Sequence, residues 1–125
     1  MDDSKKIVLV EDDEMILKSL TYFLKSNNYE AMGFDNGLDA IEYITKNHQA
    51  INLVITDLNL PFAGGQQIIH SIKQIENATI GIIVLTSSGV ESTELEVFRL
   101  GADDFISKPF SPPVLLKRIE KLISK

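Results

Sequence analysis

The most constraining feature of the sequence is a short apolar run that ends abruptly at a carboxylate. Residues 51–56 are rich in isoleucine, leucine and valine; Asp57 follows them directly, and Pro61 comes soon after. Such a run is typical of a strand buried on both faces, as in a parallel sheet. The residue just beyond such a strand points into the crevice where open α/β sheets bind ligands. Asp57 is also a typical turn residue, so its role depends on the rest of the chain.

The remaining segments alternate between two spacing patterns. Short β-branched runs predict strands, and apolar residues three or four positions apart predict amphipathic helices. The predicted strands are 7–10, 29–34, 51–56, 80–85 and 104–107, and the predicted helices lie near 14–27, from Gly37, after Gly64-Gly65, around 91–100 and from Pro112 onward. With no linker, repeat or low-complexity stretch between them, these elements predict an α/β fold. Its parallel sheet is covered by helices on both faces, with right-handed crossovers.

The expected inward faces follow from the same spacing. In the third helix we predict one apolar face made of Ile68, Ile69, Ile72 and Ile75. In the fourth helix we predict that Leu95 and Phe98 face the core together with Val97. Gly101 is well placed as the glycine that ends this helix. The strand before it is predicted to end in the turn 86–89.

Composition limits the class of protein. The chain has 125 residues, 44% of them hydrophobic, which fits a single domain, residues 1–125, with a genuine core. The absence of cysteine excludes disulfides and thiolate sites. The sequence shows neither a signal peptide nor an apolar run of roughly 20 residues, so we expect a cytoplasmic protein without a membrane span. The net charge of −6 argues against direct nucleic-acid binding and suits a cation site.

Chemistry-bearing residues follow four of the predicted strands. The first strand is followed by Glu11 and Asp12, the third by Asp57, the fourth by Thr86 and the fifth by Lys108. In a parallel sheet these ends lie at one edge. Carboxylates brought together repel one another and favour a cation, and oxygen ligands of this kind suit Mg²⁺. A hydroxyl and an ammonium facing them could hold the oxygens of a phosphoryl group.

Each of these residues also has a simpler explanation. The acidic run from Glu11 to Glu14 precedes a helix, where the helix dipole favours negative charge. Thr86 could cap the next helix, and Lys108 could be a solvated surface lysine. Their arrival at the ends of four different strands is much harder to explain by chance.

With these residues in view, the chain resembles the response-regulator receiver domain, the phospho-accepting module of two-component signalling. The resemblance covers Lys6 to about Leu122. Its motifs are Val8-Leu9-Val10-Glu11-Asp12-Asp13, Thr56-Asp57-Leu58-Asn59-Leu60-Pro61, Thr86-Ser87, Gly101-Ala102-Asp103-Asp104 and Lys108-Pro109-Phe110. The resemblance implies a flavodoxin-like (βα)5 doubly wound sandwich with a five-stranded parallel sheet in the order 2-1-3-4-5.

The resemblance also implies a division of labour at the strand ends. Asp57 would take the phosphoryl group from a phosphohistidine on a sensor histidine kinase or phosphotransfer protein. Asp12 and Asp57 would bind Mg²⁺ directly with the backbone carbonyl of Asn59, and Glu11 would act through water. Thr86 and Lys108 would grip the phosphoryl oxygens.

Two further expectations come from the family. The Lys108–Pro109 bond should be cis. Thr86 and Phe105 should form a switch that is transmitted to the face of the fourth helix, fifth strand and fifth helix, through which a homodimer is possible. Phe105 stands where the family often has tyrosine, so it brings no hydroxyl to this position.

Other classes fit less well. A phosphatase with an aspartyl-phosphate intermediate needs a second acid two residues after the nucleophile, where this chain has Asn59. A flavin module needs a phosphate loop after the first strand, where the acidic run would repel phosphate. A pseudo-receiver usually lacks the acids or the lysine. A stand-alone phosphorelay or partner-binding receiver without transcriptional output stays open, and His48 and His70 are expected to be surface residues.

Overall fold

The computed structural model describes residues 4–87 and 91–123, with residues 91 and 92 described by their backbone alone. The elements are β1 (Lys6–Val10), α1 (Glu14–Ser26), β2 (Glu30–Phe34), α2 (Gly37–Asn47), the 3₁₀ helix η1 (His48–Ala50), β3 (Leu53–Asp57), α3 (Gly65–Lys73), β4 (Gly81–Thr86), α4 (Glu91–Leu100), β5 (Asp104–Ser107) and α5 (Pro112–Ile123). The predicted alternation is confirmed, and η1 is an element that the spacing did not predict. Ser88 and Gly89 of the predicted turn lie outside the described residues.

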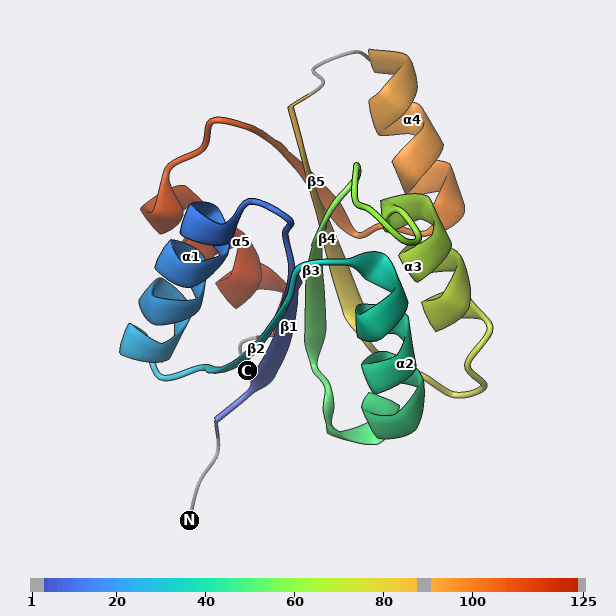
Figure 1. Cartoon of the computed structure of the whole chain (residues 1–125), viewed down its shortest axis with the longest axis horizontal. Coiled ribbons are helices and arrows are strands. Elements are labelled where there is room, and N and C mark those ends of the chain that lie inside the picture. Colours follow the sequence, from blue (N-terminus) through green and yellow to red (C-terminus); the bar gives the residue numbers. More distant parts are fainter. Residues whose placement is uncertain (1–3, 88–90, 124–125) are drawn as a thin grey trace.

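The five strands form one parallel sheet in the order β2-β1-β3-β4-β5. This order confirms the flavodoxin-like fold. Helices α1 and α5 cover one face of the sheet, and α2, α3 and α4 cover the other (Figure 1). None of the helices in the described part of the chain combines the length and apolar composition needed to span a bilayer.

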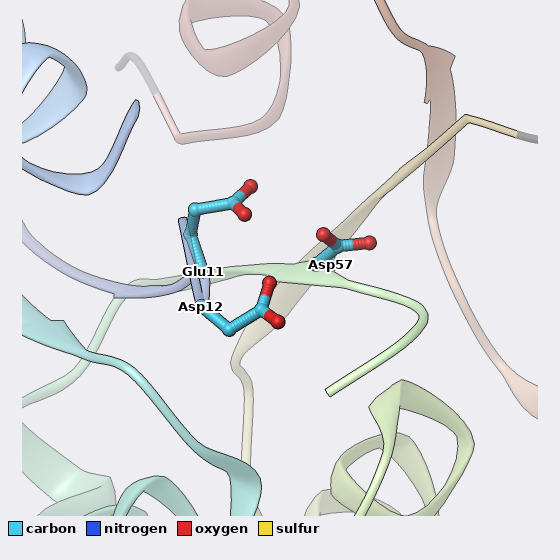
Figure 2. Close-up of side chains that lie close together, drawn as sticks. All are labelled: Glu11, Asp12 and Asp57. Carbon is cyan, nitrogen blue, oxygen red and sulfur yellow. The ribbon is translucent and has the colours of Figure 1, made fainter. Parts of the chain in front are cut away.

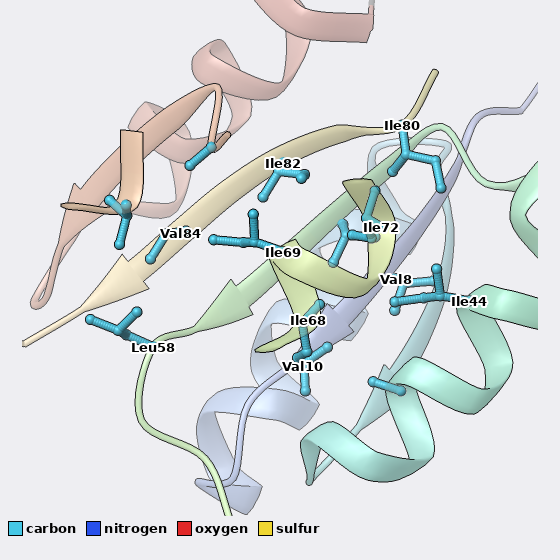
Figure 3. Close-up of a cluster of buried hydrophobic side chains, with 14 of the residues drawn as sticks. Val8, Val10, Ile44, Leu58, Ile68, Ile69, Ile72, Ile80, Ile82 and Val84 are labelled. Atoms are coloured by element: carbon cyan, nitrogen blue, oxygen red, sulfur yellow. The ribbon is translucent and has the colours of Figure 1, made fainter. Parts of the chain in front are cut away.

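Each face of the sheet carries its own apolar layer. On the α1 and α5 face the layer includes Ile7, Leu9, Leu20, Leu24, Leu53, Ile55, Ile83, Leu85, Leu115 and Ile119. On the opposite face it includes Val8, Val10, Ile44, Val54, Leu58, Ile68, Ile69, Ile72, Ile82, Val84 and Val97 (Figure 3). Burying such a side chain contributes about 1.5–3 kcal/mol, so the two layers hold the strand ends in fixed positions.

Helix α4 differs from the prediction in the face that it buries. Val97 is fully buried, whereas Leu95 is 56% and Phe98 45% exposed. Residues three apart share a helix face, so Val97 and Leu100 lie on one side and Leu95 and Phe98 on another. Only one side can meet the sheet, and the prediction chose the wrong one for Leu95 and Phe98.

The predicted ends of α4 and α3 can also be compared with the structure. Gly101 has φ of 121°, a left-handed value that favours glycine, and it follows α4 as predicted. Helix α3 ends at Lys73, so Ile75 lies beyond it. Ile75 still packs on the layer that α3 covers, although it does so from the connecting loop.

Candidate functional site

The register of the sheet places three carboxylates together. Val10 lies opposite Thr56 in the pairing of β1 with β3, so Glu11, which directly follows β1, and Asp57, the last residue of β3, lie side by side at this edge of the sheet. Glu11, Asp12 and Asp57 each offer a carboxylate oxygen, and these atoms lie within 4.8 Å of one another (Figure 2). No other group of three or more His, Asp or Glu residues in the described part of the chain is placed to hold a metal ion.

Lys108 directly follows the edge strand β5, and its side chain reaches this cluster. Its Nζ donates to Glu11 Oε1 at 2.7 Å and to Asp57 Oδ2 at 2.8 Å. Its backbone N–H donates to the carbonyl oxygen of Thr86 at 2.7 Å, which ties the end of β5 to the end of β4. The Lys108–Pro109 bond is cis, as predicted. The sequence placed Lys108 at this edge, but it did not predict that two carboxylates share the ammonium.

Burial and hydrogen bonding shift the pKa values of Glu11 and Lys108 in this cluster. Glu11 is 1% and Asp57 7% exposed, while Asp12 is exposed to solvent. Burial raises the pKa of Glu11, and the hydrogen bond from Lys108 opposes that rise only in part. Burial alone would lower the pKa of Lys108, but its hydrogen bonds to Asp57 and Glu11 prevail and raise it. Lys108 therefore stays charged at neutral pH beside two buried carboxylates.

The acidic residues after β1 have two different roles, one at the start of α1 and one in the charged cluster. The carboxylate of Asp13 caps α1 by accepting a hydrogen bond from the Ile16 N–H at 3.0 Å. The Glu11 side chain belongs to the charged cluster: its Oε1 accepts from Lys108 Nζ, and its Oε2 accepts from the Asp13 N–H at 3.0 Å. The helix-capping explanation of this run therefore holds for Asp13 and does not account for Glu11.

The turn after β3 brings Asn59 close to Asp57. The Asn59 backbone N–H donates to Asp57 Oδ1 at 3.3 Å, a long bond that leaves this oxygen weakly held. The Leu58 N–H donates to the Leu85 carbonyl oxygen at 2.9 Å, so the turn starts from a fixed point on β4.

The two residues of the predicted switch lie on neighbouring strands. Thr86 is fully buried at the end of β4, and Phe105 is 8% exposed on β5. The Phe105 ring packs against Phe98 of α4 with ring centroids 6.4 Å apart. Phe105 thus contacts α4, although Phe98 itself is half exposed.

The charges fit a divalent cation. Three carboxylates and one ammonium leave a formal charge of −2 on the cluster. Mg²⁺ commonly binds one or two carboxylates and keeps several waters, and the exposed Asp12 provides an open side for them. His48 and His70 lie in η1 and α3, outside this cluster.

Comparisons with known proteins agree with this geometry. The family model described as the response regulator receiver domain matches residues 7–120. The regulatory protein VanRc of Enterococcus gallinarum is 33% identical over 117 residues, covering 94% of this chain and 49% of that protein. The transcriptional regulatory protein SrrA of Staphylococcus aureus is 34% identical over 122 residues, covering 98% of this chain and 49% of that protein. The chain thus spans about half the length of the curated relatives it matches.

Solved structures show the same similarity. A response regulator receiver domain protein from Clostridium thermocellum has a TM-score of 0.88 at 26% identity, covering 95% of this chain and 94% of that one. The BeF3-activated DrrB receiver domain has a TM-score of 0.85 at 30% identity, covering 98% of this chain and 99% of that one. The chain therefore belongs to the response regulator receiver domains of two-component systems.

Proposed function

We propose that residues 1–125 act as one cytoplasmic receiver domain whose Asp57 accepts a phosphoryl group from a phosphohistidine. The donor would be a sensor histidine kinase or a phosphotransfer protein. The observation that carries this proposal is the convergence of the Glu11, Asp12 and Asp57 carboxylates, with Lys108 Nζ 2.8 Å from Asp57 Oδ2. A carboxylate crowded by other charges and buried beside an ammonium is placed for nucleophilic attack on a phosphoryl group.

In the proposed reaction, a carboxylate oxygen of Asp57 forms a bond to phosphorus while the P–N bond to histidine breaks. The electron pair of that bond stays on the imidazole nitrogen, which then takes up a proton. Asp57 Oδ1 is the better placed oxygen, because it holds only the 3.3 Å bond from Asn59, whereas Oδ2 holds Lys108.

The neighbouring residues would neutralise the phosphoryl charge. Asp12, Asp57 and the Asn59 backbone carbonyl would hold Mg²⁺, with Glu11 acting through water, and the ion supplies positive charge beside the phosphoryl oxygens when bound. Lys108 would exchange a carboxylate contact for a phosphoryl oxygen. Thr86, whose carbonyl oxygen already accepts from the Lys108 N–H, would donate its hydroxyl to another.

Phosphorylation from a small donor tests this assignment. Wild-type protein is incubated with acetyl phosphate and Mg²⁺, and its intact mass is measured. We expect one acid-labile phosphoryl group, which EDTA and the Asp57→Asn substitution both abolish. Glu76→Gln removes an exposed carboxylate from the loop between α3 and β4, at the opposite edge of the sheet, and should leave labelling unchanged. Full labelling of Asp57→Asn, or indifference to EDTA, would overturn the proposal.

We also propose that phosphorylation is transmitted to the face of α4, β5 and α5, and that this face forms a homodimer. Leu95 and Phe98 expose apolar surface there, and the Phe98 ring touches the buried Phe105. Arg118 pairs with Asp104 at 2.7 Å within the chain. A partly exposed pair of this kind contributes about 0–1 kcal/mol, so apolar contacts would provide most of the affinity.

Sedimentation with and without beryllofluoride plus Mg²⁺ tests the dimer. We expect association to increase with beryllofluoride and to weaken in Leu95→Ser. Leu38→Ser is the matched control, because Leu38 on α2 is 60% exposed and lies away from α4. A monomer in both states, with unchanged amide exchange over residues 93–118, would contradict both the dimer and the switch.

The output of the domain is also a proposal. The names of VanRc and SrrA describe regulatory proteins about twice as long as this chain. The receiver itself would not bind DNA, given its net charge of −6. A stand-alone phosphorelay or partner-binding role without transcriptional output is the alternative, and it would leave the chemistry at Asp57 unchanged.

A further inference from the structure

Strand β2 forms an open edge of the sheet. Within residues 4–87 and 91–123, no strand pairs with its outer side. The Glu30 N–H donates to the Lys5 carbonyl oxygen and the Phe34 carbonyl oxygen accepts from Glu11, so these two residues face β1. Because alternate residues of a strand share a direction, Ala31 and Gly33 direct their N–H and C=O groups outward. This spacing can pair with one additional extended strand.

A groove of about 460 Å³ runs along this edge beside α1. Its lining residues are Leu17, Lys18, Thr21, Tyr22, Lys25, Ala31, Met32 and Gly33. The small side chain of Ala31 and the absent one of Gly33 leave the edge backbone accessible next to an apolar wall formed by Leu17 and Tyr22. Strand β2 contains no proline and no lysine, which are common protections of natural sheet edges.

The rim of the groove is positive although the chain carries a net charge of −6. Lys25 has no ion-pair partner among the described residues. Lys18 reaches Glu14 at 3.5 Å, but both side chains are largely exposed, so that pair holds the ammonium weakly. Both ammonium groups are therefore available to a ligand that lies along the groove.

We propose that this groove binds an extended acidic segment of a partner protein, which adds a sixth strand beside β2. Main-chain hydrogen bonds to Ala31 and Gly33 would provide the pairing. Glutamate side chains of the segment would lay their methylene groups on the α1 wall and reach Lys18 and Lys25 with their carboxylates. The surface lies on β2 and α1, apart from the α4, β5 and α5 face.

A second copy of this chain is the competing occupant, and charge disfavours it. A two-fold axis through Met32 would pair two β2 strands and place both α1 helices on the same side of the joined sheet. Lys18 and Lys25 of each copy would then face those of the other. Like charges placed opposite one another are destabilising, whereas an acidic strand would pair with them.

The test uses a short synthetic peptide in which glutamate and valine alternate, with the same peptide carrying lysine in place of glutamate as its counterpart. Each is titrated into isotope-labelled protein, and amide shifts and hydrogen exchange are followed. With the acidic peptide we expect saturable shifts along β2 and protection of the Ala31 and Gly33 amides from exchange. With the lysine peptide we expect neither. Lys18→Glu/Lys25→Glu should weaken binding about tenfold or more, as expected when attractive exposed pairs become repulsive. Lys121→Glu, an exposed lysine in the last turn of α5, should leave binding unchanged.

Ala31→Pro provides an independent variant, because it removes an outward N–H that the pairing with β1 does not use. It should abolish the protection of β2 by the acidic peptide. Absence of saturable shifts at millimolar acidic peptide, equal binding of the lysine peptide, or shifts confined to another surface would each overturn the proposal. Protection of the Ala31 and Gly33 amides that grows with protein concentration alone would instead identify a second copy as the occupant.

Discussion

The bodies of the strands and their carboxyl ends differ sharply in what they bury. Residues Ile7 to Val10 and Ile82 to Leu85 are fully buried and entirely apolar. At the carboxyl ends of β1 and β3, the chain buries Glu11 and Asp57 against the ammonium of Lys108. Burial of apolar side chains stabilises the fold, whereas burial of charge costs stability unless it is compensated. The comparison indicates that the apolar layers hold together a site that would otherwise separate.

The largest expected effect comes from damaging the strand bodies. Ile55 is fully buried in the layer under α1 and α5, so Ile55→Ala should lower the free energy of unfolding by about 3–4 kcal/mol. Ile55→Val, which removes a single methylene, should cost about 1 kcal/mol. Denaturant unfolding measures both. Mg²⁺ affinity of the folded protein should change little, and a parallel loss of affinity would show that the two regions are not separable.

The strand bodies are also the part of the fold that the sequence predicts best. Unbroken runs such as 80–85 have few alternatives to a buried strand, and alternation with helices then requires a parallel sheet. Once the sheet is parallel, Glu11, Asp57, Thr86 and Lys108 must meet at one edge. The strand order and the cis bond at Pro109 came from family resemblance, because no local pattern in the chain specifies them.

The features that the sequence did not predict are determined by tertiary packing and not by local sequence patterns. Helix α4 carries apolar residues on two faces, and only packing against β5 and α3 selects Val97 over Leu95 and Phe98. The sharing of Lys108 by Glu11 and Asp57 depends on the path of the chain after β5. The division of the acidic run, with Asp13 as the cap, depends on the angle at which α1 leaves the sheet.

Among substitutions at the strand ends, removing the Lys108 ammonium should have the largest effect on the unfolding free energy. Lys108→Ala leaves two buried carboxylates without their shared ammonium, and we expect a loss of about 2–3 kcal/mol in unfolding free energy without Mg²⁺. Lys108→Met keeps the aliphatic length and loses the charge, so it should lose nearly as much. Added Mg²⁺ should recover part of the loss in both variants. If Lys108→Met matches wild type, packing and not charge is what Lys108 contributes.

Removing an acid should act in the opposite direction. Asp12 is the exposed member of the three carboxylates, and Asp12→Asn should raise the unfolding free energy by about 1 kcal/mol without Mg²⁺, because it removes like-charge repulsion. The same variant should bind Mg²⁺ more weakly, as measured by the increase in unfolding temperature on adding the ion. Glu76→Gln, at the opposite edge of the sheet, is the control and should change neither quantity. Destabilisation by Asp12→Asn in the absence of metal would mean that the cluster does not repel itself.

The smallest expected effect is a slope with pH, and it isolates the cost of burying Glu11. Because burial raises the pKa of Glu11, the folded state holds this proton more tightly than the unfolded state does. The stabilisation from the protonated form is therefore complete below the ordinary carboxyl range, near pH 4.5, and is lost as the pH rises through the raised pKa. In Glu11→Gln that group no longer titrates, so the unfolding free energy should fall less than in wild type as the pH rises above about 4.5. Chemical denaturation at several pH values without Mg²⁺ measures the difference, and identical slopes in Glu11→Gln and wild type would show that the buried carboxylate is fully compensated by Lys108.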